Sequence, residues 1–313
     1  MRILTRDNNF VMTRQTKQIE WPTIALIAAC MGTWMVSTWL VGRQGQWPFL
    51  ALAALCVTLQ SSLQHEVLHG HPTRMRLVNE ALVGVAIGLF IPYRRFKALH
   101  LQHHNDANLT DPYEDPETNY MAKADWDRLP APAQWLRQVN NTMVGRLILG
   151  PAVAVIGFWL ADARRLLAGD GRVALAWALH AVSVSLALGW VLAVCHIGIW
   201  TYVFAVAYPA FSLLTLRTFL EHRAEQAVPE RTCIVEDDSG FWGLLFLNNN
   251  LHVVHHMEPT VPWYRLPVLY AAGREQYRSR NGGYCFPSYW AIVRTYAFRS
   301  KEPVPHPFLR RQP

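Results

Sequence analysis

The sequence predicts an all-α integral membrane protein with four transmembrane helices in two hairpins and a cytoplasmic helical cap. Among its 313 residues, 51% are hydrophobic and only 16% are charged, whereas an average soluble domain carries about 25% charged residues. Four apolar stretches approach or reach the roughly 20 residues that a helix needs to cross a bilayer. The same composition excludes a mainly disordered chain, because disordered chains are poor in apolar residues. Since no internal repeat or linker-like tract is evident, we treat residues 1–313 as one domain.

The first two apolar stretches, residues 22–41 and 47–64, form the first predicted hairpin. Neither contains Lys, Arg, Asp or Glu, and only a short turn separates them. We interpret residues 22–41 as a span that stays in the protein and not as a cleaved leader, since the apolar run continues for eleven residues past Cys30. Aromatic anchors are common at the ends of membrane helices, and here they are Trp21, Trp39 and Trp47.

The last two apolar stretches, residues 173–194 and 197–216, form the second predicted hairpin. Only His180 interrupts the first of them, and the turn is little more than Cys195 and His196. Trp190 and Trp200 lie near the expected helix ends, as Trp21, Trp39 and Trp47 do in the first hairpin.

Two further apolar patches are not expected to span the membrane. Residues 81–92 are too few, and residues 143–160 contain Arg146 and Pro151. We interpret residues 143–160 as an interfacial helix. Spanning by this segment is the alternative, and it would reverse the orientation of everything that follows.

Lys and Arg are concentrated outside the predicted spans. Residues 65–172 carry twelve of the 29, residues 217–313 carry another twelve, and the first 18 residues carry four. The turns at the other end of the hairpins contain only Arg43. By the positive-inside rule, both termini and both long segments are cytoplasmic.

Thirteen histidines are the unusual feature of the composition, and eight of them fall in three clusters. The clusters read HEVLH at residues 65–69, HLQHH at residues 100–104 and HVVHH at residues 252–256. On a helix, residues i, i+3 and i+4 share one face, so each cluster is expected to point two or three imidazoles at one place. Packing alone rarely needs such a face, whereas neutral imidazole is a ligand for Fe, Zn, Cu and Ni.

The positions of the clusters predict that they meet. His65 follows the second predicted span and His222 follows the fourth, so both lie at the cytoplasmic end of the stem. The other two clusters belong to the cytoplasmic segments. Nine imidazoles are too many for one metal ion and suit two. The candidate ligands are His65, His69, His100, His103, His104, His222, His252, His255 and His256.

With these motifs, the sequence resembles the membrane-bound fatty acid desaturase and hydroxylase superfamily, and within it the bacterial desaturases. The NNN run at residues 248–250 and the MEPTVPWYRLP segment at residues 257–267 are also similar to that family. The resemblance extends from about residue 21 to about residue 270. It implies a four-helix membrane stem in the bacterial inner membrane, with a cytoplasmic cap that holds a di-iron centre.

The resemblance also implies the cofactors and the roles of the residues. Two Fe²⁺ ions are held by the eight clustered histidines, and His222 matches a further histidine that known members use after the fourth helix. The metal centre carries the chemistry with O2 as co-substrate, and no separate catalytic side chain is implied. Polar neighbours are expected to bind the second nitrogens of the ligand imidazoles. The candidates are Glu66, Asp106, Glu221 and Asn249.

The implied activity is an O2-dependent desaturation that uses two external electrons and introduces a C=C bond into an aliphatic chain, which we expect to be a fatty acyl lipid. The five cysteines form no CxxC pair, so a separate protein such as ferredoxin or cytochrome b5 with its reductase is expected to supply the electrons. One hypothesis docks this donor on the basic surface near the clusters, which includes Arg74, Arg76, Arg94, Arg95 and Lys97. The alternative is that these side chains face anionic lipid. No nucleic-acid partner is expected.

Other functions stay open at this point. A hydroxylase or ketolase of the same superfamily uses similar histidine clusters. A desaturase of a non-lipid aliphatic metabolite, as in the step that forms the vinyl group of rhizobitoxine, is also compatible. HEVLH further matches the HExxH motif of zinc metalloproteases, with Glu66 as the general base, but that function leaves the other two clusters without a role. A non-enzymatic metal-binding membrane protein is the last alternative.

Overall fold

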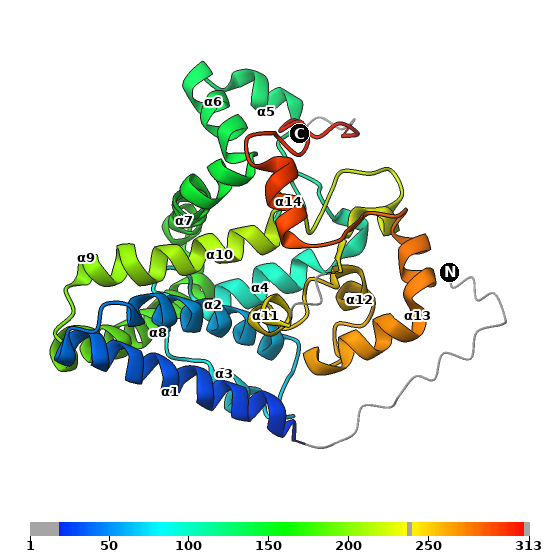
Figure 1. The fold of residues 1–313 in the computed structure, drawn as a ribbon. Coiled ribbons are helices and arrows are strands. Elements are labelled where there is room, and N and C mark those ends of the chain that lie inside the picture. Colours follow the sequence, from blue (N-terminus) through cyan, green and yellow to red (C-terminus); the bar gives the residue numbers. More distant parts are fainter. Residues whose placement is uncertain (1–18, 237–239, 310–313) are drawn as a thin grey trace.

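The computed structural model describes residues 19–236 and 240–309 and confirms an all-α fold (Figure 1). The α-helices are α1 (Trp21–Gln44), α2 (Phe49–Leu68), α3 (Arg76–Leu82), α4 (Tyr93–His103), α5 (Lys123–Arg128), α6 (Ala131–Asn140), α7 (Met143–Leu167), α8 (Gly171–Leu188), α9 (Ile199–Tyr202), α10 (Tyr208–Thr218), α11 (Phe241–Leu245), α12 (His252–Met257), α13 (Leu266–Arg280) and α14 (Tyr289–Tyr296). The short strands β1 (Ile234–Val235) and β2 (Cys285–Phe286) pair in parallel. The basic tail residues Arg2, Arg6, Arg14 and Lys17, on which the predicted orientation partly depends, lie outside the described residues.

The first hairpin consists of α1 and α2, which lie side by side (Figure 1). Helix α1 ends at Gln44 and is capped by Gly45, whose φ of 67° is left-handed and whose N–H donates to the carbonyl of Val41. Glycine adopts this conformation without strain. Helix α2 then runs to Leu68 and carries His65 and Glu66 in its last turn. The hairpin therefore places the first histidine cluster at the end of a long packed helix.

The second hairpin is built from α8 and from the α9–α10 run. A π-helical segment, η2 (Gly189–Val194), continues α8, and another, η3 (Val203–Ala207), joins α9 to α10. At the end far from the histidines, Arg43 Nε donates to the carbonyl of Val194 at 2.8 Å. A Cβ added at Gly42 would lie 1.7 Å from the carbonyl oxygen of Cys195. The two hairpins are thus in close contact at this end.

Four helical stretches in the described ranges are long and apolar enough to cross a membrane: Trp21–Gln44, Met143–Leu167, Gly171–Val194 and Ile199–Thr218. This set differs from the predicted one at two places. Helix α2 is absent from it, because polar side chains from Gln60 onward lower its hydropathy. Helix α7 belongs to it, although an interfacial helix was expected at residues 143–160.

The contacts of α7 explain how the two hairpins can point the same way although a long apolar helix lies between them in the sequence. Near its start, the carbonyl of Arg146 accepts a hydrogen bond from the Thr215 hydroxyl at 3.2 Å. Near its end, Asp162 forms an ion pair with Arg95 at 2.8 Å. Both ends of α7 are thus attached to helices that lead to candidate ligands, since α10 precedes His222 and α4 carries His100. In Figure 1, α7 lies at a steep angle to α10.

The Arg95–Asp162 pair is buried, since the two side chains are only 8% and 1% exposed. Trp177 Nε1 also donates to Asp162, at 2.9 Å, and the neighbouring Arg94 pairs with Glu80. The hypothesis that Arg94 and Arg95 dock an electron donor is therefore wrong for Arg95, whose guanidinium is used inside the fold.

Replacing Arg95 with alanine should lower the free energy of unfolding by about 3–5 kcal/mol, because it leaves the Asp162 carboxylate buried without its partner. Chemical unfolding in detergent measures this change. The control is Arg128→Ala, which breaks a pair with Asp125 whose side chains are 74% and 40% exposed and should change stability by about 1 kcal/mol at most. A stable Arg95→Ala protein that only loses electron transfer would instead restore the docking hypothesis.

The cap positions α12 through its apolar side chains. Val253 and Val254 are almost fully buried and pack in one cluster with Ile234 of β1 and Leu266 of α13. The N–H of Val253 donates to the carbonyl of Cys233, directly before β1. Since the valines of α12 face this cluster, its three histidines face the other helices.

Candidate metal centre

The structure brings all nine candidate histidines together in two groups. In each group the ligand nitrogens lie within 4.8 Å of one another. We name them the five-histidine group and the four-histidine group. The first consists of His65, His69, His100, His104 and His255, and the second of His103, His222, His252 and His256.

Each of the second and third histidine clusters divides between the two groups. The pairs at spacing i, i+4 stay together, as for His100 with His104 and for His252 with His256. The remaining members, His103 and His255, join the opposite group. Two of the three imidazoles of each cluster therefore meet at one place, as expected, and the third points to the other group. Adjacent residues on a helix are about 100° apart, so neighbours such as His103 and His104 point to different sites.

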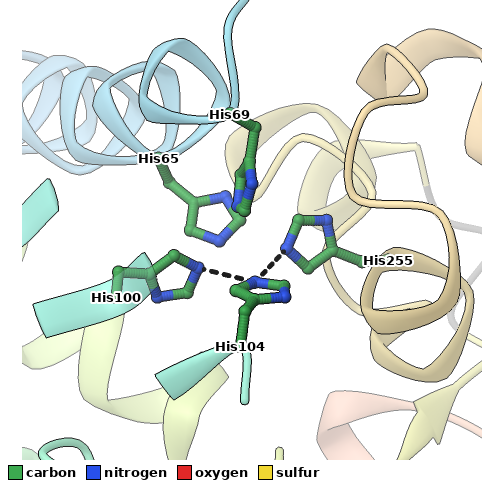
Figure 2. Close-up of side chains that lie close together, drawn as sticks. All are labelled: His65, His69, His100, His104 and His255. Atoms are coloured by element: carbon green, nitrogen blue, oxygen red, sulfur yellow. Dashed lines mark hydrogen bonds between the residues drawn. The ribbon is translucent and has the colours of Figure 1, made fainter. Parts of the chain in front are cut away.

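In the five-histidine group the rings converge on one point (Figure 2). The Nε2 atom of His104 lies 3.0 Å from Nε2 of His100 and 3.1 Å from Nε2 of His255. The Nε2 atoms of His65 and His69 are buried and have no hydrogen-bond partner among the described residues. Buried polar atoms without partners are costly, and a metal ion at this point would satisfy both. The donor set therefore fits a metal ion.

In the four-histidine group, His222 lies between the histidines of α4 and α12. Its Nε2 atom is 2.9 Å from Nε2 of His103 and 3.0 Å from Nε2 of His252. His256 completes the group, with its Nε2 3.2 Å from that of His252. His222 comes from the segment that follows α10, where it forms an antiparallel bridge with Thr232.

The family model for fatty acid desaturases matches residues 44–288, which include all nine histidines. The chain belongs to the fatty acid desaturase family. No curated protein matches the chain at a significant level. Membership of this family makes the chain an integral membrane oxidoreductase of the desaturase or hydroxylase type, with an acyl substrate and a histidine-rich site that is compatible with a metal centre.

Carboxylate and amide oxygens of the protein lie next to the Nδ1 atoms of four of these histidines. Asp106 lies 2.9 Å from His256 Nδ1, and Asn249 Oδ1 lies 3.1 Å from His252 Nδ1. Both residues were expected from the sequence to bind the second nitrogens of the candidate ligand imidazoles. An Nδ1–H that donates to such an oxygen leaves the Nε2 lone pair free for a metal ion. These contacts fix the orientation of the two rings.

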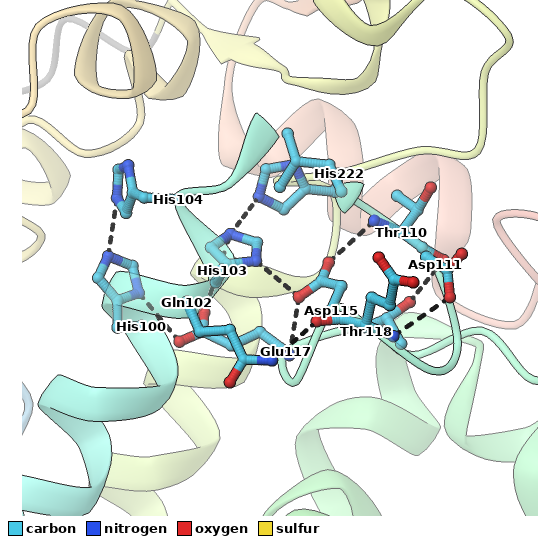
Figure 3. A network of polar contacts seen from close by, with 12 residues as sticks. His100, Gln102, His103, His104, Thr110, Asp111, Asp115, Glu117, Thr118 and His222 are labelled. Carbon is cyan, nitrogen blue, oxygen red and sulfur yellow. Dashed lines mark hydrogen bonds and ion pairs between the residues drawn. The ribbon is translucent and has the colours of Figure 1, made fainter. Parts of the chain in front are cut away.

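Two carboxylates in the loop after α4 were not expected. Asp115 lies 2.8 Å from His103 Nδ1, and Glu117 lies 2.9 Å from His100 Nδ1 (Figure 3). Asp115 is also fixed by the backbone, since it accepts hydrogen bonds from the N–H groups of Thr110 and Glu117. The acidic DPYEDPE stretch after the second cluster was the available signal for these residues.

The other two expected neighbours lie further from the imidazoles. Glu221 Oε1 is 3.8 Å from His252 Nδ1 and accepts a hydrogen bond from Asn249 Nδ2 at 3.2 Å. It therefore acts on His252 mainly through Asn249. Glu66 contacts none of the nine histidines by a hydrogen bond in the described part of the chain. Its Oε1 accepts from the N–H of Trp263 at 3.0 Å and lies 3.7 Å from His71 Nε2.

Burial and mutual repulsion keep most of these imidazoles neutral, as metal ligands must be. Burial lowers the pKa of His69 to about 2. Burial also lowers the pKa values of further members, which are His104, His222, His252, His255 and His256. His103 is the exception: burial lowers its pKa, but Glu117 and Asp115 outweigh burial and raise the pKa to about 9.

Metal binding to the four-histidine group should therefore release about one proton per ion at pH 7. Only His103 in this group has a pKa raised above 7, to about 9, so its proton competes with the metal below that pH. The apparent affinity should rise about tenfold per pH unit as the pH increases towards 9, and then level off. Calorimetric titration in buffers of different ionisation enthalpy measures the released protons. An affinity that is independent of pH between 7 and 9 would show that His103 is already neutral.

Proposed function

We propose that this chain is a membrane di-iron desaturase that uses O2 and two external electrons to introduce a C=C bond into an aliphatic acyl chain. The observation that carries the proposal is the division of nine buried or half-buried histidines into two groups, each with its ligand nitrogens within 4.8 Å. The five-histidine group would hold one Fe²⁺ ion and the four-histidine group the other. Two such ions supply the O2-dependent oxidation of an unactivated C–H bond. Reduction of O2 to two water molecules takes four electrons, of which the substrate gives two and the donor gives two.

In this proposal the protein holds and shields the site. Asp106, Asp115, Glu117 and Asn249 fix the Nδ1 protons of their histidines, and no side chain is required as a general base. The site is closed to water on the α12 side, where His252 and His255 are only 1% and 3% exposed. Exclusion of water protects a strongly oxidising site from side reactions.

The proposal also includes the source of the electrons and the location of the enzyme. We infer that a separate protein such as ferredoxin or cytochrome b5 with its reductase supplies the electrons. Two observations support a cytoplasmic site with both termini on the same side. One is the twelve Lys and Arg residues in each of the segments 65–172 and 217–313, and the other is the attachment of both ends of α7 to α10 and α4, the helices that lead to His222 and His100. The proposed location is the bacterial inner membrane, as the resemblance to bacterial desaturases implies.

The zinc protease is disfavoured by the position of Glu66. A general base must lie within reach of a metal-bound water, but the Glu66 carboxylate accepts from the Trp263 backbone and faces His71. The same site geometry is compatible with a hydroxylase, a ketolase or a desaturase of a non-lipid aliphatic metabolite. Analysis of the product and of the accepted substrate distinguishes these enzymes from the proposed one.

The test is metal and product analysis on the detergent-purified chain, loaded anaerobically with Fe²⁺ and supplied with a reduced donor, O2 and acyl lipids. We expect about two metal ions per chain and a product that has lost two hydrogens. A product that has gained one oxygen atom from ¹⁸O2 would establish a hydroxylase. A single metal ion that depends on His65 and His69 but not on His103 would overturn the di-iron proposal.

A further inference from the structure

A cavity of about 500 Å³ opens beside the five-histidine group. One wall is the loop from His69 to Arg74, and the other is the segment from Thr260 to Leu269 that leads into α13. His69 forms part of this wall and also belongs to the five-histidine group. A molecule that fills the cavity therefore contacts a residue of the five-histidine group. The volume lies in the range of about 300–1,000 Å³ that is usual for ligand pockets.

The charged side chains around the cavity are mainly positive. Arg74 and Arg265 line opposite walls, and both are exposed. Within residues 19–236 and 240–309, neither guanidinium has a carboxylate within 4.0 Å. The acid in the lining, Glu20, lies 2.6 Å from His71 Nδ1 and is already paired. Two arginines that have no ion-pair partner in the described part of the chain therefore line one opening, where they attract an anion.

Part of the lining is suited to a hydrocarbon chain. Its apolar residues are Pro72, Val261, Pro262, Val268 and Leu269, and Thr73, Thr260 and Tyr264 add polar groups. Val268 is 70% exposed. The cavity thus combines apolar residues, a member of the five-histidine group and two cations, and an amphiphile with one anionic end offers matching groups.

We infer that this cavity binds the anionic end of the acyl substrate, a carboxylate or a phosphate, between Arg74 and Arg265, and that the adjoining chain passes His69. The inference rests on the proposed function, which it deepens by naming the chemistry of the substrate's polar end. Guanidinium groups bind carboxylate and phosphate oxygens in pairs. A neutral ester or alcohol cannot form these charge-assisted hydrogen bonds and is bound more weakly.

Equilibrium binding tests the inference without turnover. The full-length, metal-loaded chain is placed in phosphatidylcholine nanodiscs, and the probes are hexadecanoate, hexadecyl phosphate and the neutral methyl hexadecanoate. The variant is Arg74→Ala/Arg265→Ala. The matched control is Arg280→Ala, which removes an exposed arginine of α13 that does not line the cavity. The metal content of every sample is measured as well.

We expect at least one anionic probe to bind with an affinity about tenfold or more above that of the neutral ester. This difference in affinity should disappear in the double variant but not in Arg280→Ala. Preference for hexadecanoate would identify a carboxylate as the bound group, and preference for hexadecyl phosphate a phosphate. Equal binding of ester and anions by the unmodified chain overturns the inference, whether or not the variant folds. Unchanged anion binding by the double variant also overturns it. Failure of the proposed function is seen separately, as fewer than two metal ions or as the absence of product.

Discussion

Replacing His255 or His252 with alanine should reduce turnover by more than about 100-fold, with each change removing a different metal ion. Changes to residues that only orient a ligand typically cost 10–100-fold in affinity or activity, and loss of a ligand should exceed this. His255 Nε2 lies 3.1 Å from Nε2 of His104 in the five-histidine group, and His252 Nε2 lies 3.0 Å from Nε2 of His222 in the four-histidine group. Metal analysis of the purified variants should find about one ion per chain in each.

The control for these variants is His196→Asn. His196 is exposed, lies in the turn between the two helices of the second hairpin and has a φ of 58°, which asparagine tolerates better than most residues. It should keep both ions and full activity. Loss of both ions in His255→Ala, with His252→Ala losing neither, would contradict the assignment of two separate groups.

The histidine clusters could be predicted from the sequence because their geometry is local. The spacing of His65 and His69 places them on one face of a helix wherever that helix packs, and the structure keeps this pair together. The position of His222 after the fourth apolar stretch likewise predicted its arrival at the site. The division of nine histidines into five and four was not predictable, because it depends on how α2, α4 and α12 cross.

Other features depend on tertiary contacts that leave little trace in the sequence. Arg95 could not be distinguished from Arg94 as a buried residue, because its partner Asp162 is 67 positions away. Glu66 was expected beside the metal centre because it follows His65, yet on a helix its side chain points about 100° away from that of His65. The length of α7 was underestimated because the apolar run ends at Leu160, whereas the helix continues through Asp162, Arg164 and Arg165 to Leu167.

Replacing Asp115 with asparagine should weaken metal binding by the four-histidine group by about 10–100-fold while leaving the five-histidine group loaded. The Asp115 carboxylate meets three N–H groups, those of Thr110, Glu117 and the His103 ring. An asparagine side chain has one carbonyl oxygen, and its NH2 group must face one of these donors. Competition with a chelator of known affinity measures the loss of metal affinity, and metal analysis shows how many ions per chain are retained.

The control is Asp127→Asn, which alters an exposed residue paired with Lys123 and should change neither metal affinity nor stability. A second measurement separates a role in orienting His103 from a general loss of structure. Asp115 helps Glu117 to raise the pKa of His103 to about 9, so Asp115→Asn should lower that pKa and reduce the proton release that accompanies metal binding at pH 7. If the variant binds both ions more weakly and the number of protons released per bound ion is unchanged, Asp115 only supports the loop. Retention of one ion with fewer protons released would show that the carboxylate acts on the metal through the imidazole of His103.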